Sequence, residues 1–237
     1  NLAIAGIAIG TVLLPNLSKY VEQNKINKIN FIQNKSLELS LFLSLPATFA
    51  LLISSEQITS ALFGYGSFDK TSVKNSAEAL FYFALGLPAF ALIKVFSSFL
   101  FARHNTKIPF IFSLISVILN IVISLYFFNK IGFIIIPIAT TISSWLNALI
   151  LFIYLINKNY FEFSKVFFSS VLKISFAVIV TMYVFYYLID FFEKYLNFDS
   201  SFKLVTIILI VLVVFVFYIL LSLLTKAFKI SDIKLKY

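Results

Sequence analysis

One lysine interrupts a long apolar stretch of this sequence. Lys94 lies nine residues before Arg103, inside the otherwise apolar segment 79–102. Nine helical residues span about 13 Å, and the half-thickness of a bilayer's hydrocarbon core is about 15 Å. With Arg103 at the interface, Lys94 would lie near the membrane midplane, where a lysine costs about 3 kcal/mol. We therefore expect Lys94 to face a central cavity and bind an anionic substrate group. The alternatives are an ion-pair partner in a missing part of the protein and a lysine satisfied by backbone carbonyls beside Pro88.

Two further kinds of residue in the apolar segments are candidates for function. Asn120 and Thr140 carry oxygens that would suit a monovalent cation or line a cavity, although small polar residues in membranes more often hydrogen-bond neighbouring helices. Pro46, Pro88 and Pro137 are expected inside or near the middle of helices. Proline kinks a helix and frees a carbonyl, so these three are hinge candidates. The alternative is that membrane helices simply tolerate proline.

The remaining chemistry is sparse. The chain has no cysteine and one histidine, which argues against a metal site. We expect all ten carboxylates in loops or at helix ends, so they form no catalytic pair. There is no phosphate-binding glycine loop of the Walker type. The sequence therefore predicts a protein that is not an enzyme, with no catalytic residue and no cofactor beyond a candidate monovalent cation.

The elements that would position Lys94 are transmembrane helices. Of the 237 residues, 61% are hydrophobic and 12% are charged, whereas soluble domains average about 25% charged. The fold class predicted is all-α, a polytopic transmembrane bundle. Residues 1–158 would form a partial lobe with the end of one helix, and residues 159–237 an appended helix pair with a tail. The predicted spans are 37–55, 73–103, 108–129, 131–157, 164–192 and 202–228.

The charges of the loops predict an orientation. Loops at one face carry twelve of the 19 Lys and Arg residues and four of the ten acids, while the other face carries five cations and six acids. Cytoplasmic loops are enriched in Lys and Arg. We therefore expect a multi-pass protein of the bacterial cytoplasmic (inner) membrane with a cytoplasmic C-terminus. The net charge of +9 then comes from these cytoplasmic loops, which would contact membrane lipids. No nucleic-acid partner is expected.

An ordered set of motifs resembles a known family. The motifs are Gly10–Ser18 (GTVLLPNLS), Leu62–Phe68 (LFGYGSF), Tyr82–Ala89 (YFALGLPA), Phe101–Pro109 (FARHNTKIP), Asn120, Ala139–Thr140 and Trp145–Ala148 (WLNA). In this order and spacing they resemble the MurJ (MviN) family of lipid II flippases, within the multidrug/oligosaccharidyl-lipid/polysaccharide exporter superfamily. The motifs that support this resemblance extend from residue 1 to about residue 158.

The resemblance implies a function in peptidoglycan biosynthesis and cell wall biogenesis. The chain would be the C-terminal half of a two-lobed flippase that moves lipid II, the undecaprenyl-pyrophosphoryl disaccharide-pentapeptide, across the membrane by alternating access. Its partners would be lipid II, membrane lipids and the missing N-terminal half. Lys94 falls on a lysine of the family's cationic cavity, and the last two helices would form a groove for the polyprenyl tail. The alternatives are a related exporter of polysaccharide-lipid or drug substrates, or a non-transporting membrane scaffold.

Overall fold

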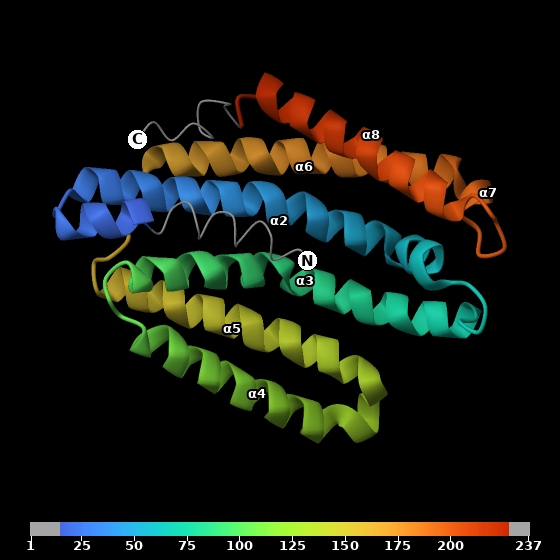
Figure 1. The fold of residues 1–237 in the computed structure, drawn as a ribbon, viewed down its shortest axis with the longest axis horizontal. Helices are drawn as coiled ribbons and strands as arrows, with labels where there is room; N and C mark the ends of the chain where they lie inside the picture. The colour runs from blue at the N-terminus through green and yellow to red at the C-terminus, as the bar shows by residue number, and fades with distance from the viewer. Residues whose placement is uncertain (1–14, 228–237) are drawn as a thin grey trace. The chain divides into compact units, whose positions relative to one another are not determined.

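The computed structural model describes residues 15–227, and within them the ordered elements are all helical, as predicted. Residues 15–22 are helical and precede the long helices (Figure 1). The elements are α2 (Ile26–Phe63), α3 (Lys70–Phe101), α4 (Lys107–Ile131), the 3₁₀ turn η1 (Gly132–Ile134), α5 (Ile135–Asn157), α6 (Lys165–Phe191), α7 (Glu193–Leu196) and α8 (Lys203–Leu224). The start of the Gly10–Ser18 motif and the C-terminal tail lie outside the described residues.

The helices are long and apolar enough to span a bilayer. Five stretches qualify within residues 15–227, and one of them, Lys107–Asn157, contains both α4 and α5. The main departure from the predicted spans is α2, which begins at Ile26 rather than near residue 37. The N-terminal part of α2 carries charged residues that a hydropathy reading assigns to a loop. In the structure its Gln33 and Asn34 side chains donate to backbone carbonyls of the loop between α5 and α6.

Contacts divide the chain into two compact units. Within the described residues, unit 1 contains residues 15–44 and 85–168, and unit 2 contains residues 45–84 and 169–227. Helices α2, α3 and α6 therefore each contribute a segment to both units. The division into residues 1–158 and 159–237 stays a prediction, because it concerns the lobes of a larger protein.

Unit 1 is built around the pair α4 and α5, which run side by side and are joined at η1 (Figure 1). Gly132 makes the turn possible, because its φ of 76° is a conformation that side chains rarely adopt. Aromatic rings then join α3 to α5 and to the loop after α5. Phe96 lies 5.8 Å from Phe152, and Phe99 stacks on Phe161 at 6.0 Å, measured between ring centroids.

Unit 2 has its own apolar core where α6 and α8 meet the end of α2. Phe185 and Ile189 of α6 pack with Ile207, Ile210 and Val214 of α8, and Ala61 of α2 joins them fully buried. The small side chain of Ala61 lets the helix backbones approach closely, which is how membrane helices gain packing energy without a hydrophobic driving force.

The candidate hinges differ in position. α2 continues through Pro46, and its non-helical residue is Ser54, with φ −128° and ψ 27°. The Ser54 hydroxyl donates to the carbonyl oxygen of Ala50 at 2.8 Å, a bond that tends to bend helices. Pro88 lies inside α3. Pro137 is the third residue of α5 rather than mid-span, so its missing N–H costs no intrahelical bond. Hinge motion at the three prolines stays a prediction.

Candidate functional site

Lys94 is the most distinctive side chain of α3. Every other side chain from residue 86 to 100 is buried or half-buried, whereas Lys94 is exposed. Its carbonyl accepts a hydrogen bond from the Ser98 hydroxyl at 2.9 Å. Among residues 15–227 the Lys94 ammonium has no ion-pair partner. The side chain is therefore available at the surface of a helix that is otherwise packed on this stretch.

The turn of α3 before Lys94 is held against α5. The indole N–H of Trp145 donates to the Leu85 carbonyl at 3.0 Å, in the turn where the Pro88 ring disturbs the helix. A Cβ on Gly86 would lie 3.0 Å from the Thr141 hydroxyl oxygen, so glycine permits this close approach. Trp145 therefore joins the two helices through a hydrogen bond to a backbone carbonyl of α3.

Asn120 and Thr140 meet in a polar seam between α4 and α5. The Asn120 amide donates to the Thr140 hydroxyl oxygen at 2.9 Å, and that hydroxyl donates to the Ile136 carbonyl at 2.8 Å. The Ser116 hydroxyl donates to the Ser143 carbonyl at 2.6 Å along the same seam. These bonds fit the role of small polar residues in joining membrane helices. A cation-binding or cavity-lining role for Asn120 and Thr140 stays a prediction.

A cluster that sequence reasoning missed holds the loop between α5 and α6, which we call the loop clamp (Gln33, Asn34, Arg103 and Tyr160). The Arg103 guanidinium donates to the Phe99 and Tyr160 carbonyls, each at 2.8 Å, and lies 4.6 Å from the Tyr160 ring centroid. The Gln33 amide also donates to the Tyr160 carbonyl, at 3.0 Å. Burial lowers the pKa of Arg103, and its interaction with Tyr160 opposes that shift.

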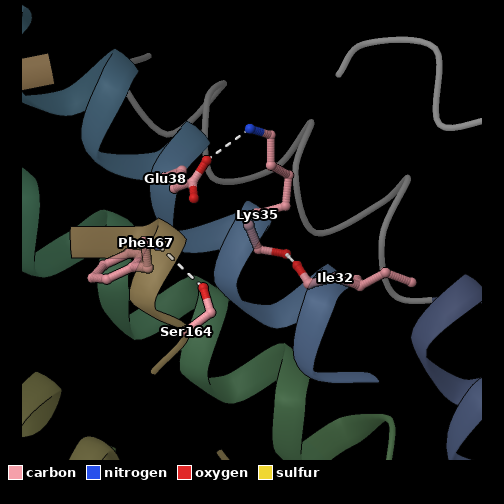
Figure 2. A network of polar contacts seen from close by, with 6 residues as sticks. Ile32, Lys35, Glu38, Ser164 and Phe167 are labelled. Atoms are coloured by element: carbon pink, nitrogen blue, oxygen red, sulfur yellow. Dashed lines mark hydrogen bonds and ion pairs between the residues drawn. The ribbon is translucent and has the colours of Figure 1, made fainter. Parts of the chain in front are cut away.

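Asn34 completes the loop clamp by pairing with backbone at two points. Its amide N–H donates to the Glu162 carbonyl at 2.8 Å, and its side-chain oxygen accepts the Ser164 N–H at 3.0 Å. The Ser164 hydroxyl in turn accepts the N–H of Phe167 at 3.1 Å at the start of α6 (Figure 2). The clamp therefore fixes the N-terminus of α6 in unit 1. The signal available in the sequence was two adjacent amides, Gln33 and Asn34, on an apolar helix.

The expectation that every carboxylate lies in a loop or at a helix end is wrong for Glu38, Glu56 and Glu78, which lie within α2 and α3. Glu38 lies within α2 and is 5% exposed. It forms an ion pair with Lys35 at 2.7 Å, one turn earlier in the helix (Figure 2). Because a buried carboxylate is costly without a partner, the i,i+3 lysine is what allows Glu38 inside the helix.

Lys203 lies at the start of the predicted span 202–228, but it is buried rather than solvated at the membrane edge. It begins α8 and is 2% exposed. Its ammonium donates to the carbonyls of Gly64 and Phe198, each at 2.7 Å, and lies 4.3 Å from the Tyr65 ring centroid. Lys203 thus joins the α2–α3 loop to the start of α8. Gly64, part of a family-like motif, has no room for a side chain, since a Cβ would lie 2.6 Å from the backbone carbonyl oxygen of Ser60.

The last helices also form an apolar groove. A pocket of about 470 Å³ lies along α6, α7 and α8. Its lining includes Leu188, Phe192, Val205, Leu209 and Val213. A groove of this composition can accept an alkyl chain.

No group of three or more His, Cys, Asp or Glu side chains within residues 15–227 is placed to hold a metal ion.

The fold and its exposed apolar helices define the chain as part of a polytopic α-helical membrane protein. A sequence model of the family described as "Lipid II flippase MurJ" matches residues 1–207. The chain therefore belongs to the MurJ family of lipid II flippases, which confirms the resemblance drawn from the motifs.

Individual relatives agree with this assignment. The chain is 42% identical over 151 residues to the "Probable lipid II flippase MurJ" of Rhizobium meliloti (strain 1021), covering 64% of this chain and 28% of that protein. It is 34% identical over 213 residues to the protein of the same description from Rickettsia prowazekii (strain Madrid E), covering 88% of this chain and 42% of that protein. The chain spans less than half the length of these relatives.

A solved structure extends the likeness to the fold. The chain superimposes on "Lipid II flippase MurJ, inward closed conformation" with a TM-score of 0.72 and 26% sequence identity. The match covers 93% of this chain and 44% of the solved one.

Proposed function

We propose that this chain works as part of a lipid flippase that moves lipid II across the cytoplasmic membrane by alternating access. The observation that carries the proposal is Lys94, an exposed ammonium on a packed apolar helix of a chain in this family. A positively charged group within a membrane is costly unless it faces a wet or charged environment. The pyrophosphate and peptide carboxylates of lipid II are anions that would pair with it. On this proposal the chain transports its substrate and is not an enzyme.

The apolar groove supports the same function. A substrate with a charged headgroup and a long prenyl tail needs two surfaces of opposite character. The groove along α6 and α8 offers an apolar surface, and Lys94 offers a cationic one. We propose that the tail lies in this groove or in lipid while the headgroup contacts Lys94. The rest of the cationic surface would come from the part of the protein that lies outside this chain.

The orientation proposed places Lys158 on the cytoplasmic side and Asp69 on the outer side. Because these 237 residues contain no cysteine, single cysteines introduced at these positions report on topology without background from this part of the protein. A membrane-impermeant thiol reagent added to intact cells should label Asp69→Cys and leave Lys158→Cys unlabelled. The reverse pattern would overturn the proposed orientation, and labelling of both before lysis would refute a multi-pass arrangement between them.

The function is tested by Lys94→Ala in the protein that carries this chain. We expect lipid II flipping to fall at least tenfold, measured as lipid II at the outer leaflet accessible to a membrane-impermeant probe. Lys94→Arg keeps the charge and should retain most of the flipping. Lys173→Ala is the matched control, because Lys173 is also an exposed lysine within a transmembrane helix. Wild-type flipping by Lys94→Ala, at wild-type abundance, would refute the role of Lys94.

A further inference from the structure

A second pocket in unit 2 has a character unlike the apolar groove. It encloses about 440 Å³ between the C-terminal part of α2, the start of α3 and the segment from α6 to Phe198. Small-molecule sites in proteins commonly measure about 300–1,000 Å³. Apolar side chains form part of its wall, among them Ile53, Val73 and Ile189. The volume and the mixed lining suit a small polar ligand with a short aliphatic part.

The charges around this pocket are mainly negative. Glu56 of α2, Asp190 of α6 and Glu193 of α7 all line it and are exposed. Among residues 15–227 none of these three carboxylates has an ion-pair partner. Lys70 also lines the pocket, but its ammonium pairs with Asp199 at 2.9 Å. The pocket therefore presents uncompensated negative charge from three different helices.

A buried hydroxyl in the lining points independently to a ligand. Ser60 is 4% exposed, and its hydroxyl oxygen has no hydrogen-bond partner among the described residues. An unpaired buried hydroxyl costs free energy, and each such group in a native structure calls for a partner. Because Ser60 lines the pocket, a polar atom bound there would supply that partner.

The character of the ligand follows from these groups. Carboxylates accept hydrogen bonds, and the ring of Tyr186, which also lines the pocket, offers an aromatic face that attracts cations. The carboxylates are not grouped as metal ligands within residues 15–227. We infer that this pocket binds a primary ammonium group on a short aliphatic stem. The ammonium donates to carboxylates of this acidic lining (Glu56, Asp190 and Glu193), and the Ser60 hydroxyl pairs with a polar atom of the ligand.

Two sources supply such a group, and binding measurements separate them. The first probe is phosphatidylethanolamine, compared with phosphatidylcholine of the same acyl chains, by native mass spectrometry of the purified protein. The second is soluble 1,3-diaminopropane, by isothermal titration calorimetry in detergent. Preference for the ethanolamine lipid alone identifies a headgroup site, and binding of the soluble diamine identifies a site for free amines. Either result supports the inference.

Variants decide whether the pocket is the place of binding. The triple variant Glu56→Gln, Asp190→Asn, Glu193→Gln should weaken binding of whichever probe binds the wild type at least tenfold. The single variant Glu193→Gln, at an exposed residue, should weaken it about threefold. Glu78→Gln removes an exposed carboxylate that does not line the pocket and should change binding less than twofold. Equal binding of the ethanolamine and choline lipids together with no diamine binding would overturn the inference. Unchanged binding by the folded Glu193→Gln variant would also overturn the inference. Displacement of the bound probe by Mg²⁺ alone would overturn it as well.

Discussion

The loop clamp gives a quantitative prediction for Arg103. In Arg103→Lys the flat guanidinium is lost, and one ammonium cannot reach both the Phe99 and Tyr160 carbonyls with the same geometry. Hydrogen bonds from charged groups contribute about 1.5–3 kcal/mol each. The contact with the Tyr160 ring contributes about 0.5–1 kcal/mol where it is partly exposed. We expect Arg103→Lys to cost about 2 kcal/mol and Arg103→Ala about 4 kcal/mol.

The assay is thermal unfolding of the purified protein in detergent. In a chain of this length about 1 kcal/mol shifts the midpoint by about 2–4 °C. Arg103→Lys should therefore lower it by about 4–8 °C. Lys107→Ala, which removes an exposed cation four residues later, is the control and should shift it by at most about 2 °C, because surface substitutions usually stay within about 0.5 kcal/mol.

A double-mutant cycle separates the two parts of the clamp. Both acceptors of Arg103 are backbone carbonyls, so Tyr160→Ala leaves them in place and removes only the ring. The coupling between Arg103→Ala and Tyr160→Ala should then equal the ring contact alone, about 0.5–1 kcal/mol. A coupling of about 3 kcal/mol, or an Arg103→Lys variant as stable as the wild type, would refute the reasoning that the carbonyl bonds carry most of the energy.

Three further predictions concern other parts of the chain. Lys203→Met leaves two carbonyls without their donor and should cost about 2–4 kcal/mol in the same unfolding assay. The control Lys194→Met, at an exposed lysine nearby, should cost at most about 0.5 kcal/mol. Equal effects of the two substitutions would contradict the buried role of Lys203. Trp145→Phe keeps the ring but removes the bond to the Leu85 carbonyl, and should cost about 1 kcal/mol, so a gain in stability would argue against that bond. Asp69 accepts the N–H of Ser72 at the start of α3, and this bond lowers the pKa of Asp69. The lowered pKa means that the cap is complete above the ordinary pKa of aspartate and is lost as the pH falls through the lower folded value. The protection factors of the amides at residues 70–73, taken relative to unstructured exchange at the same pH, should therefore fall at acid pH in the wild type. They should already be low at neutral pH in Asp69→Ala, and equal protection in both proteins at neutral pH would rule out the cap.

Much of the helical fold is predictable because it is local in the chain. Runs of apolar residues bounded by lysines mark α4 and α8 closely, since the bilayer sets the length of a span and charges mark its ends. The start of α2 was harder to place. Its first turns carry lysines and amides, whose residue types suggest exposure to solvent. In the structure, however, Gln33 and Asn34 are buried against the α5–α6 loop. Hydropathy cannot register a partner that lies more than a hundred residues away in sequence.

The sequence by itself determined the membrane class, the helical fold, the family and the isolated position of Lys94. These follow from composition, from the spacing of charges and from ordered motifs, all of which act over short stretches of chain. Only the tertiary structure decided that Glu38 is buried with Lys35, that Lys203 caps carbonyls of a distant loop, and that Glu56, Asp190 and Glu193 share one pocket. The physical reason is that the cost of a charge depends on its surroundings. Those surroundings are assembled from segments far apart in sequence, so the residue type alone does not reveal whether a charge is solvated, paired or free to bind a ligand.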